Sequence, residues 1–127
     1  MLFRSDGDAG FGLDLGTGFF SVTGNKVLAS REIGMYLYVG IHDGTMNNNQ
    51  ISFVRSSGNA IGILARGTQN VSITNNYLVG GEGAASEGIT IGTEYSADVP
   101  IPSLDNVIAP NAFGPSWGMD YDPSNLP

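Results

Sequence analysis

The feature of this sequence that most restricts its possible folds is a short motif that recurs along the chain. Residues 20–27 (FSVTGNKV) and 71–78 (VSITNNYL) share one pattern: apolar, Ser, apolar, Thr, turn residue, Asn, any residue, apolar. A third copy is predicted to begin at Ile51, with Ser56 in place of the asparagine, and a fourth, less similar copy spans 106–113 (NVIAPNAF). A repeated pattern of this length indicates that one structural unit is used several times.

The residues in and around the copies favour β strands. Glycine makes up 19 of the 127 residues and interrupts almost every window of ten. Each interior glycine costs a helix about 1 kcal/mol relative to alanine. What remains are short segments in which apolar and polar residues alternate between turn residues, a pattern typical of strands. Apolar segments led by glycine or alanine follow the first three copies, at 34–37, 60–63 and 88–91. The sequence therefore predicts an all-β fold.

Recurring strands predict a solenoid, in which the chain winds through successive coils. One coil cannot bury its inward side chains alone, whereas stacked coils build a continuous core. The first three copies start 31 and 20 residues apart, and the shorter spacing is near the minimum for a coil of three short strands. An antiparallel sandwich with glycine-rich turns is the alternative that would give a similar pattern.

Side-chain alternation within each copy predicts which residues face the core. The residues expected to point inward are Phe20, Val22, Ile51, Phe53, Val71 and Ile73. Their serine neighbours are expected to point outward: Ser21, Ser52 and Ser72. The asparagine after each strand tolerates a left-handed bend. In stacked coils, Asn25, Asn76 and Asn111 are expected to form a ladder of side-chain amide hydrogen bonds.

Two segments carry a resemblance to a known fold. Residues 70–78 (NVSITNNYL), followed by 87–91 (EGITI), resemble coils of the right-handed parallel β-helix of the pectate-lyase-like superfamily. That superfamily includes polysaccharide lyases, glycoside hydrolases, uronan epimerases and phage tailspikes. The resemblance implies a right-handed parallel β-helix of about three to four coils over residues 19–114. Residues 1–18 are then expected to be an N-terminal cap or extension, and residues 115–127 a proline-containing C-terminal tail.

The charge and composition restrict the partners that we expect. There are 12 Asp and Glu residues against 5 Lys and Arg, a formal charge of -7. This charge repels phosphate backbones, so no nucleic-acid partner is expected. The longest apolar run, 35–41, is far shorter than the ~20 residues that cross a bilayer, and no membrane span is expected. No secretory signal pattern is visible, which leaves the location open, with an extracellular or virion-surface site if the chain is part of a longer protein.

Acidic residues around the third coil are the candidates for catalysis. They are Glu82, Glu87, Glu94 and Asp98, on segments expected to be loops. Two carboxylates at a suitable separation are the minimum for glycoside hydrolysis. The simpler interpretation is a solvated acidic surface. The motifs of pectate lyases, polygalacturonases and uronan epimerases are absent from the sequence, and the question of catalysis stays open.

Aromatic residues are the candidates for ligand binding, because an aromatic face suits the apolar face of a sugar ring. They are Tyr36, Tyr38, Tyr95 and Trp117. Tyr36 and Tyr38 share one side of a strand, outward if Met35 and Leu37 point inward. Three aspartates near the N-terminus faintly resemble a calcium loop: Asp6, Asp8 and Asp14. They lack the central glycine and the closing glutamate of such a loop. No cofactor is therefore predicted, and calcium is the one metal that these aspartates could bind.

These observations predict a module that binds or processes polysaccharide. A first alternative is a structural module like those of tailspikes or fibres, which would form homo-oligomers because exposed strand edges at the ends of a short stack invite pairing with another chain. A second alternative is a fragment of a glycan lyase, hydrolase or epimerase.

Overall fold

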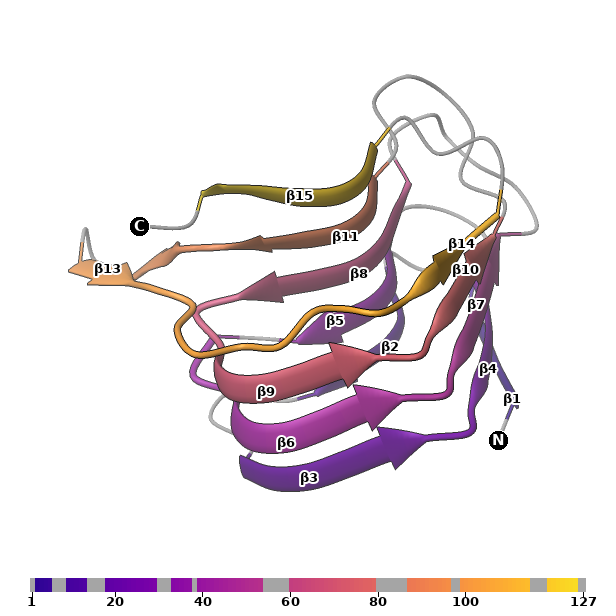
Figure 1. The fold of residues 1–127 in the computed structure, drawn as a ribbon, viewed down its shortest axis with the longest axis horizontal. Coiled ribbons are helices and arrows are strands. Elements are labelled where there is room, and N and C mark those ends of the chain that lie inside the picture. The colour runs from indigo at the N-terminus through magenta and orange to yellow at the C-terminus, as the bar shows by residue number, and fades with distance from the viewer. Residues whose placement is uncertain are drawn as a thin grey trace.

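The computed structural model of the chain describes the backbone of residues 2–5, 9–13, 18–29, 33–37, 39–53, 60–79, 87–96, 99–114 and 119–125. Side chains are described for residues 18–28, 33–37, 39–52, 60–79, 87–93 and 99–114. Every regular element within these ranges is a β strand (Figure 1). In the described part of the chain there is no helix of the length and apolar character needed to cross a membrane.

Three sheets of parallel strands make up the fold. The first sheet contains, in order, β1 (Leu2–Ser5), β4 (Lys26–Ala29), β7 (Gln50–Phe53), β10 (Tyr77–Val79) and β14 (Ala112–Phe113). The second sheet contains β2 (Ala9–Leu13), β5 (Ile33–Leu37), β8 (Ile61–Arg66), β11 (Glu87–Gly92) and β15 (Met119–Asn125). The third sheet contains β3 (Gly18–Thr23), β6 (His42–Asn47) and β9 (Gln69–Thr74).

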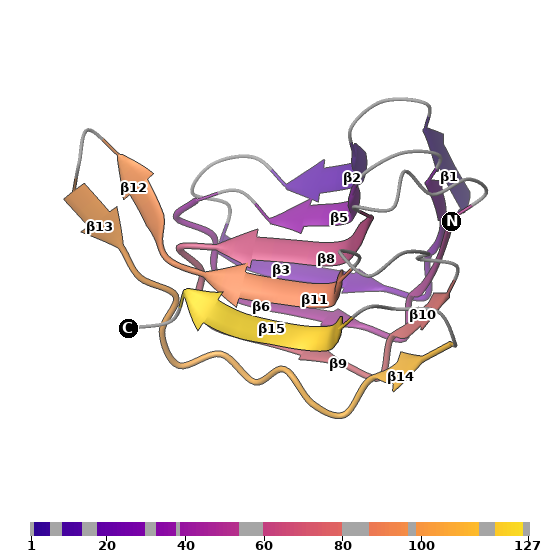
Figure 2. The same cartoon turned by 90° about the horizontal axis from the view of Figure 1, so that it is seen from above.

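The chain visits the three sheets in rotation, and each strand pairs in parallel with the equivalent strand of the next coil (Figures 1 and 2). After β11, the antiparallel hairpin of β12 (Glu94–Ser96) and β13 (Val99–Ile101) extends away from the sheets (Figure 2). Residues 104–107 then run beside β9 through two isolated bridges. Parallel pairing excludes the antiparallel sandwich, and the all-β arrangement is compatible with a β-helix-like solenoid.

Strand pairing extends into both segments expected to flank the coils. Strands β1 and β2 lie within residues 1–18 and pair with β4 and β5. Strand β15 lies within residues 115–127 and pairs with β11.

The hydrophobic core takes side chains from all three sheets. Its largest fully buried members include Met35, Leu37, Ile41, Met46, Ile51, Ile63, Ile73, Leu78, Ile89 and Ile91. Four of the residues predicted to face inward are buried: Val22, Ile51, Val71 and Ile73. Phe20 is partly buried against the core, and the side chain of Phe53 lies outside the described residues. Ser21 is exposed and Ser52 and Ser72 are partly exposed, so the predicted alternation is confirmed where side chains are described.

The register corrects the alignment of the repeats. The second copy is residues 44–51 (GTMNNNQI), because Gly44 pairs with Phe20 and with Val71. Ile51 therefore ends this copy, opposite Val27, and does not begin one. The prediction was wrong because Gly44 does not resemble the large apolar residue of the other copies. The Phe20 ring lies in the space that a Gly44 side chain would need.

The register also corrects the alignment of the glycine-led segments. Ile33 pairs with Ile61, and Ile61 pairs with Glu87. Gly34, Gly62 and Gly88 therefore align, and Gly62 rather than Ala60 leads its segment. The error of two residues did not change the predicted face, because strand side chains alternate with a period of two.

The predicted asparagine ladder is present and contains a fourth member. Asn49 takes the place assigned to Ser56, so the ladder runs through Asn25, Asn49, Asn76 and Asn111. The Oδ1 atom of each of the last three accepts hydrogen bonds from the backbone N–H and the side-chain amide of the preceding asparagine, at 2.9–3.1 Å. The left-handed bend lies one residue before the ladder, at Gly24, Asn48 and Asn75, where φ is 71°, 55° and 55°.

Candidate functional site

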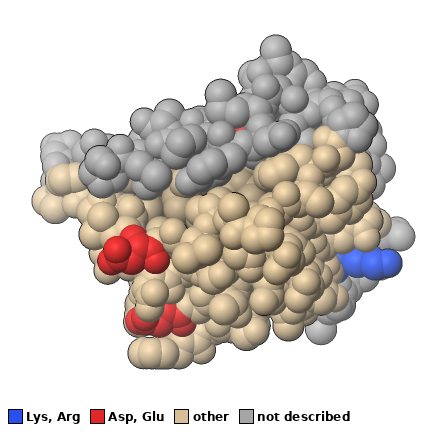
Figure 3. All heavy atoms as spheres, viewed as in Figure 1, with Lys and Arg blue, Asp and Glu red and all other residues tan. Residues whose placement is uncertain are grey.

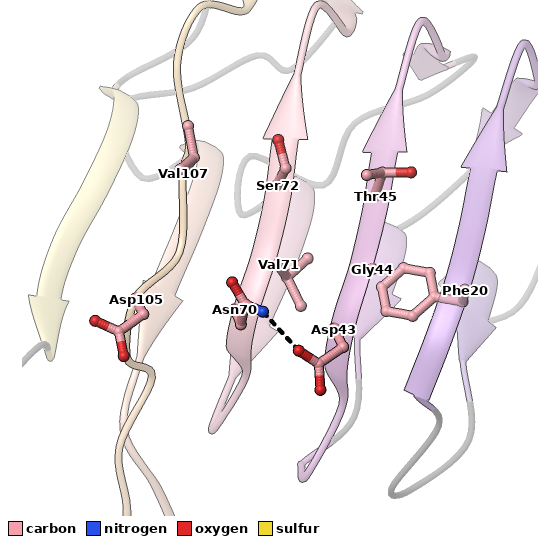
Figure 4. Close-up of a pocket in the computed structure, with 9 residues that line it drawn as sticks. All are labelled: Phe20, Asp43, Gly44, Thr45, Asn70, Val71, Ser72, Asp105 and Val107. Carbon is pink, nitrogen blue, oxygen red and sulfur yellow. Dashed lines mark hydrogen bonds between the residues drawn. The ribbon is translucent and has the colours of Figure 1, made fainter.

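A shallow pocket of about 440 Å³ lies on the outer face of the third sheet (Figure 4). We call it the outer pocket. Its lining comes from β3, β6, β9 and the segment beside β9, and therefore from four successive coils. The lining residues are Phe20, Asp43, Gly44, Thr45, Asn70, Val71, Ser72, Asp105 and Val107.

A row of left-handed residues positions the polar groups of the outer pocket. Phe19, Asp43, Asn70 and Asp105 all have φ between 52° and 56°, and the register aligns them across the strands. We call them the left-handed row. Asparagine and aspartate adopt this conformation more readily than other residues with side chains. Three members of the row, Asp43, Asn70 and Asp105, line the pocket, and Phe19 is the next member of the row beyond it. Neighbouring members are separated by the strand spacing of about 4.8 Å.

Hydrogen bonds hold both carboxylate oxygens of Asp43. Asn70 Nδ2 donates to Asp43 Oδ1 at 2.5 Å (Figure 4). His42 Nδ1 lies 2.8 Å from Asp43 Oδ2. These hydrogen bonds, first that of His42 and then that of Asn70, lower the pKa of Asp43 below the usual value for aspartate. Asp43 is therefore a carboxylate at neutral pH, in a fixed orientation but still partly exposed.

Aromatic and hydroxyl groups extend the site beyond the carboxylates. Phe19 is 85% exposed, and its ring meets the His42 ring edge-on, with 5.6 Å between centroids and 84° between planes. Thr45 and Ser72 place their side chains on the same outer face (Figure 4). Thr45 Oγ1 donates to Ser21 Oγ at 3.4 Å. The site thus offers acceptors, donors and one exposed aromatic ring.

The charge of the outer pocket is negative. Asp43 and Asp105 are its two carboxylates, and no Lys or Arg is among the described residues that line it. The described cations belong to other sheets: Lys26 begins β4 of the first sheet, and Arg66 ends β8 of the second. Figure 3 shows Asp and Glu gathered on one side of this face, with Lys and Arg on the opposite side.

The structure does not bring the predicted catalytic residues together. Glu87 begins β11, is partly buried, and accepts a hydrogen bond from Thr90 Oγ1. Glu94 belongs to β12, and its side chain lies outside the described residues. Glu82 and Asp98 also lie outside the described residues.

Of the predicted aromatic contacts, only Tyr36 has a described side chain. It is partly exposed in β5, between the fully buried Met35 and Leu37. Its cross-strand partner Leu64 is 5% exposed, so this part of the second sheet is less open than the outer pocket. Tyr95 belongs to β12, and its side chain lies outside the described residues, as do Tyr38 and Trp117.

The structure gives no metal site in the part of the chain that it describes. Asp6, Asp8 and Asp14 all lie outside the described residues. Among the residues that are described, no group of three or more His, Asp or Glu side chains is arranged to hold a metal ion.

The sequence alone did not indicate His42, Asp43, Asn70 or Asp105 as site residues. The signal was present one residue before each copy of the motif, where Phe, Asp, Asn and Asp stand. It becomes visible only when the second copy is aligned at Gly44, and that alignment depends on the strand register.

Comparison with protein-family models, with curated proteins and with solved structures finds no match for this chain.

Proposed function

We propose that this chain is a right-handed parallel β-helix module, of the kind found in the pectate-lyase-like superfamily, and that it binds polysaccharide at the outer pocket. One observation supports the fold: the chain passes through three parallel sheets in rotation. The proposed hand follows from the general rule that crossover connections between parallel strands are right-handed in nearly all proteins. The observation that carries the function is the left-handed row, of which three members, Asp43, Asn70 and Asp105, line the pocket.

The spacing of the row suits a polymer. Its side chains repeat with the strand spacing of about 4.8 Å, so a linear ligand lying across the strands would meet a hydrogen-bonding group at regular intervals. Asp43 and Asp105 accept hydrogen bonds from hydroxyl groups, and Asn70 both donates and accepts. Phe19 adds an exposed aromatic face at one end of the row, which suits the apolar face of a sugar ring.

Calorimetric titration with neutral and charged oligosaccharides tests this proposal. Asn70→Gly removes the central amide but keeps a residue that tolerates positive φ. We expect it to weaken binding by about threefold to tenfold, because a hydrogen bond between neutral groups is worth roughly 0.5–1.5 kcal/mol. Gln50→Ala is the control, since Gln50 is exposed in the first sheet. Equal affinities for the two variants, or no binding by the natural sequence, would contradict the proposal.

A structural role is the second candidate, and the ends of the sheets favour it. Among the described strands, β1, β2 and β3 each have a strand partner on one side only. We call these three strands the first-coil edge. Exposed edges pair readily with strands of another chain, so the module would assemble through this edge and need no ligand.

A further inference from the structure

We propose, on the basis of the polysaccharide binding proposed above, that the outer pocket selects glycans with free ammonium groups, that is, polymers of amino sugars, over neutral and acidic glycans. The preference is for a positively charged ligand. It follows from which charged groups the fold places at the pocket and which it places elsewhere.

Two carboxylates stand at the pocket with one amide between them. Asp43 lies on β6, Asn70 on β9 and Asp105 on the segment beside β9 (Figure 4). At a strand spacing of about 4.8 Å, the two aspartates are separated by roughly 10 Å along the row. A polymer with a cationic group on each unit can therefore place different units against the two carboxylates.

Asp43 is prepared to accept a cation. Its carboxylate has two oxygens with about four lone-pair sites in total, and the hydrogen bonds with Asn70 and His42 engage one site on each oxygen. Its side chain remains 38% exposed. The side chain lines the pocket, where an ammonium group would form a charge-assisted hydrogen bond with the carboxylate.

The outer pocket offers acidic glycans no Lys or Arg partner among its described lining residues. A uronate carboxylate would face Asp43 and Asp105 with no Lys or Arg among the described lining residues to offset the repulsion. The net charge of -7 adds a repulsive field at longer range. Neutral glycans would keep the hydrogen bonds to the row but lack the attraction between opposite charges.

The test compares three oligomers of equal length: glucosamine, N-acetylglucosamine and galacturonic acid. Titration is carried out in mildly acidic buffer, where amino groups are protonated and Asp43 stays ionised because its pKa is lowered. We expect the glucosamine oligomer to bind at least about tenfold more tightly than the neutral oligomer. Added salt should reduce this advantage because it screens exposed charges. The galacturonic acid oligomer should bind most weakly.

Charge-neutralising variants separate the pocket from the overall charge. Asp43→Asn and Asp105→Asn should each weaken binding of the glucosamine oligomer about threefold to tenfold, and by a larger factor than they weaken binding of the neutral oligomer. Asp122→Asn makes the same change in net charge on β15 of the second sheet, and it should have little effect. If Asp122→Asn weakens binding as much as the pocket variants do, attraction to the overall charge explains the result and the inference fails.

The outcomes also separate this inference from the proposed function. Equal or tighter binding of the neutral or acidic oligomer, still weakened by Asn70→Gly, would overturn the charge selectivity and leave polysaccharide binding standing. Absence of binding by all three oligomers would overturn both.

Discussion

At the scale of single residues, the asparagine ladder supplies hydrogen bonds between neighbouring coils at a corner of the fold, between one strand and the next. Asn49 and Asn76 are 2% and 1% exposed, a burial that an amide tolerates only when its polar atoms are paired. Each uses Oδ1 toward the preceding coil and Nδ2 toward the following coil and a backbone carbonyl. The ladder therefore fixes the register of the coils at the corner between the third and first sheets.

Asn76→Ala is expected to lower the free energy of unfolding by about 3 kcal/mol, since buried groups left without a partner cost roughly 1–3 kcal/mol each. The groups affected are the Asn49 backbone N–H and side-chain amide and the Met46 carbonyl. Urea denaturation measures the change. Asn25→Ala, at the partly exposed end of the ladder, should cost about 1 kcal/mol. Equal losses at the two positions would show that the ladder does not act through buried hydrogen bonds.

A second prediction at this scale concerns the titration of Asp43. The hydrogen bonds of His42 and Asn70 lower its pKa in the folded chain. Its contribution to stability is therefore present above the pKa of the unfolded chain and is lost as the pH falls through the lowered folded value. Asn70→Gly should raise the pKa toward the usual value but not reach it, because the His42 contact remains. An NMR titration of the carboxyl carbon measures both values, and an unchanged pKa would contradict the assigned cause.

At the scale of strands, aligned glycines in the second sheet allow close approach of the neighbouring strand and of side chains from the first sheet. A Cβ atom on Gly34 would overlap the Gly62 carbonyl oxygen and the Ile51 side chain. A Cβ atom on Gly62 would likewise overlap the Gly88 carbonyl oxygen and the Leu78 side chain. Backbone atoms of paired strands cannot move aside without loss of ladder hydrogen bonds, so the second positions of β5 and β8 require glycine.

Gly62→Ala is accordingly expected to destabilise the fold by about 2–3 kcal/mol through overpacking. Gly24→Asn is the matched control, since nothing lies within 4 Å of a Cβ atom placed on Gly24. The equivalent corners of the next two coils already carry Asn48 and Asn75, with positive φ. The control should change stability by less than about 0.5 kcal/mol. Thermal unfolding of the two variants compares them directly, and a tolerated Gly62→Ala would mean that the coils can separate locally.

At the scale of the whole molecule, the two ends of the stack differ. All six prolines lie between residues 100 and 127, and Pro123 belongs to β15, at the opposite end of the second sheet from β2. Proline cannot donate to a neighbouring strand and protects an edge from further pairing. The first-coil edge contains none. We infer that any self-association involves the first-coil edge.

We therefore expect the chain to form dimers or larger species, in a fraction that rises with protein concentration. Salt should increase this fraction, because the charge of -7 on each copy opposes association and is screened as ionic strength rises. Light scattering coupled to size-exclusion chromatography, at two protein and two salt concentrations, gives the mass. A mass of 13.3 kDa under every condition would contradict the prediction and show that the first-coil edge is covered within the chain.

Much of the fold followed from local pattern, whereas the candidate site did not. The burial of Val22, Val71 and Ile73 was predictable because strand side chains alternate with a fixed period. The copy that begins at Gly44 was not, because its missing side chain is replaced in space by Phe20 from another strand. The left-handed row depends on that same register across four coils. Its members become neighbours only after the strands have paired.

The unequal coil lengths have a consequence for how such a chain can change in evolution. Neighbouring ladder asparagines are 24, 27 and 35 residues apart, yet each neighbouring pair is joined by the same two hydrogen bonds. The longest interval contains the β12–β13 hairpin, which extends away from the sheets (Figure 2). Residues added between two ladder positions can thus extend away from the stacked strands without disturbing their pairing. New segments can be acquired at the coil boundaries while the core keeps one unchanging cross-section.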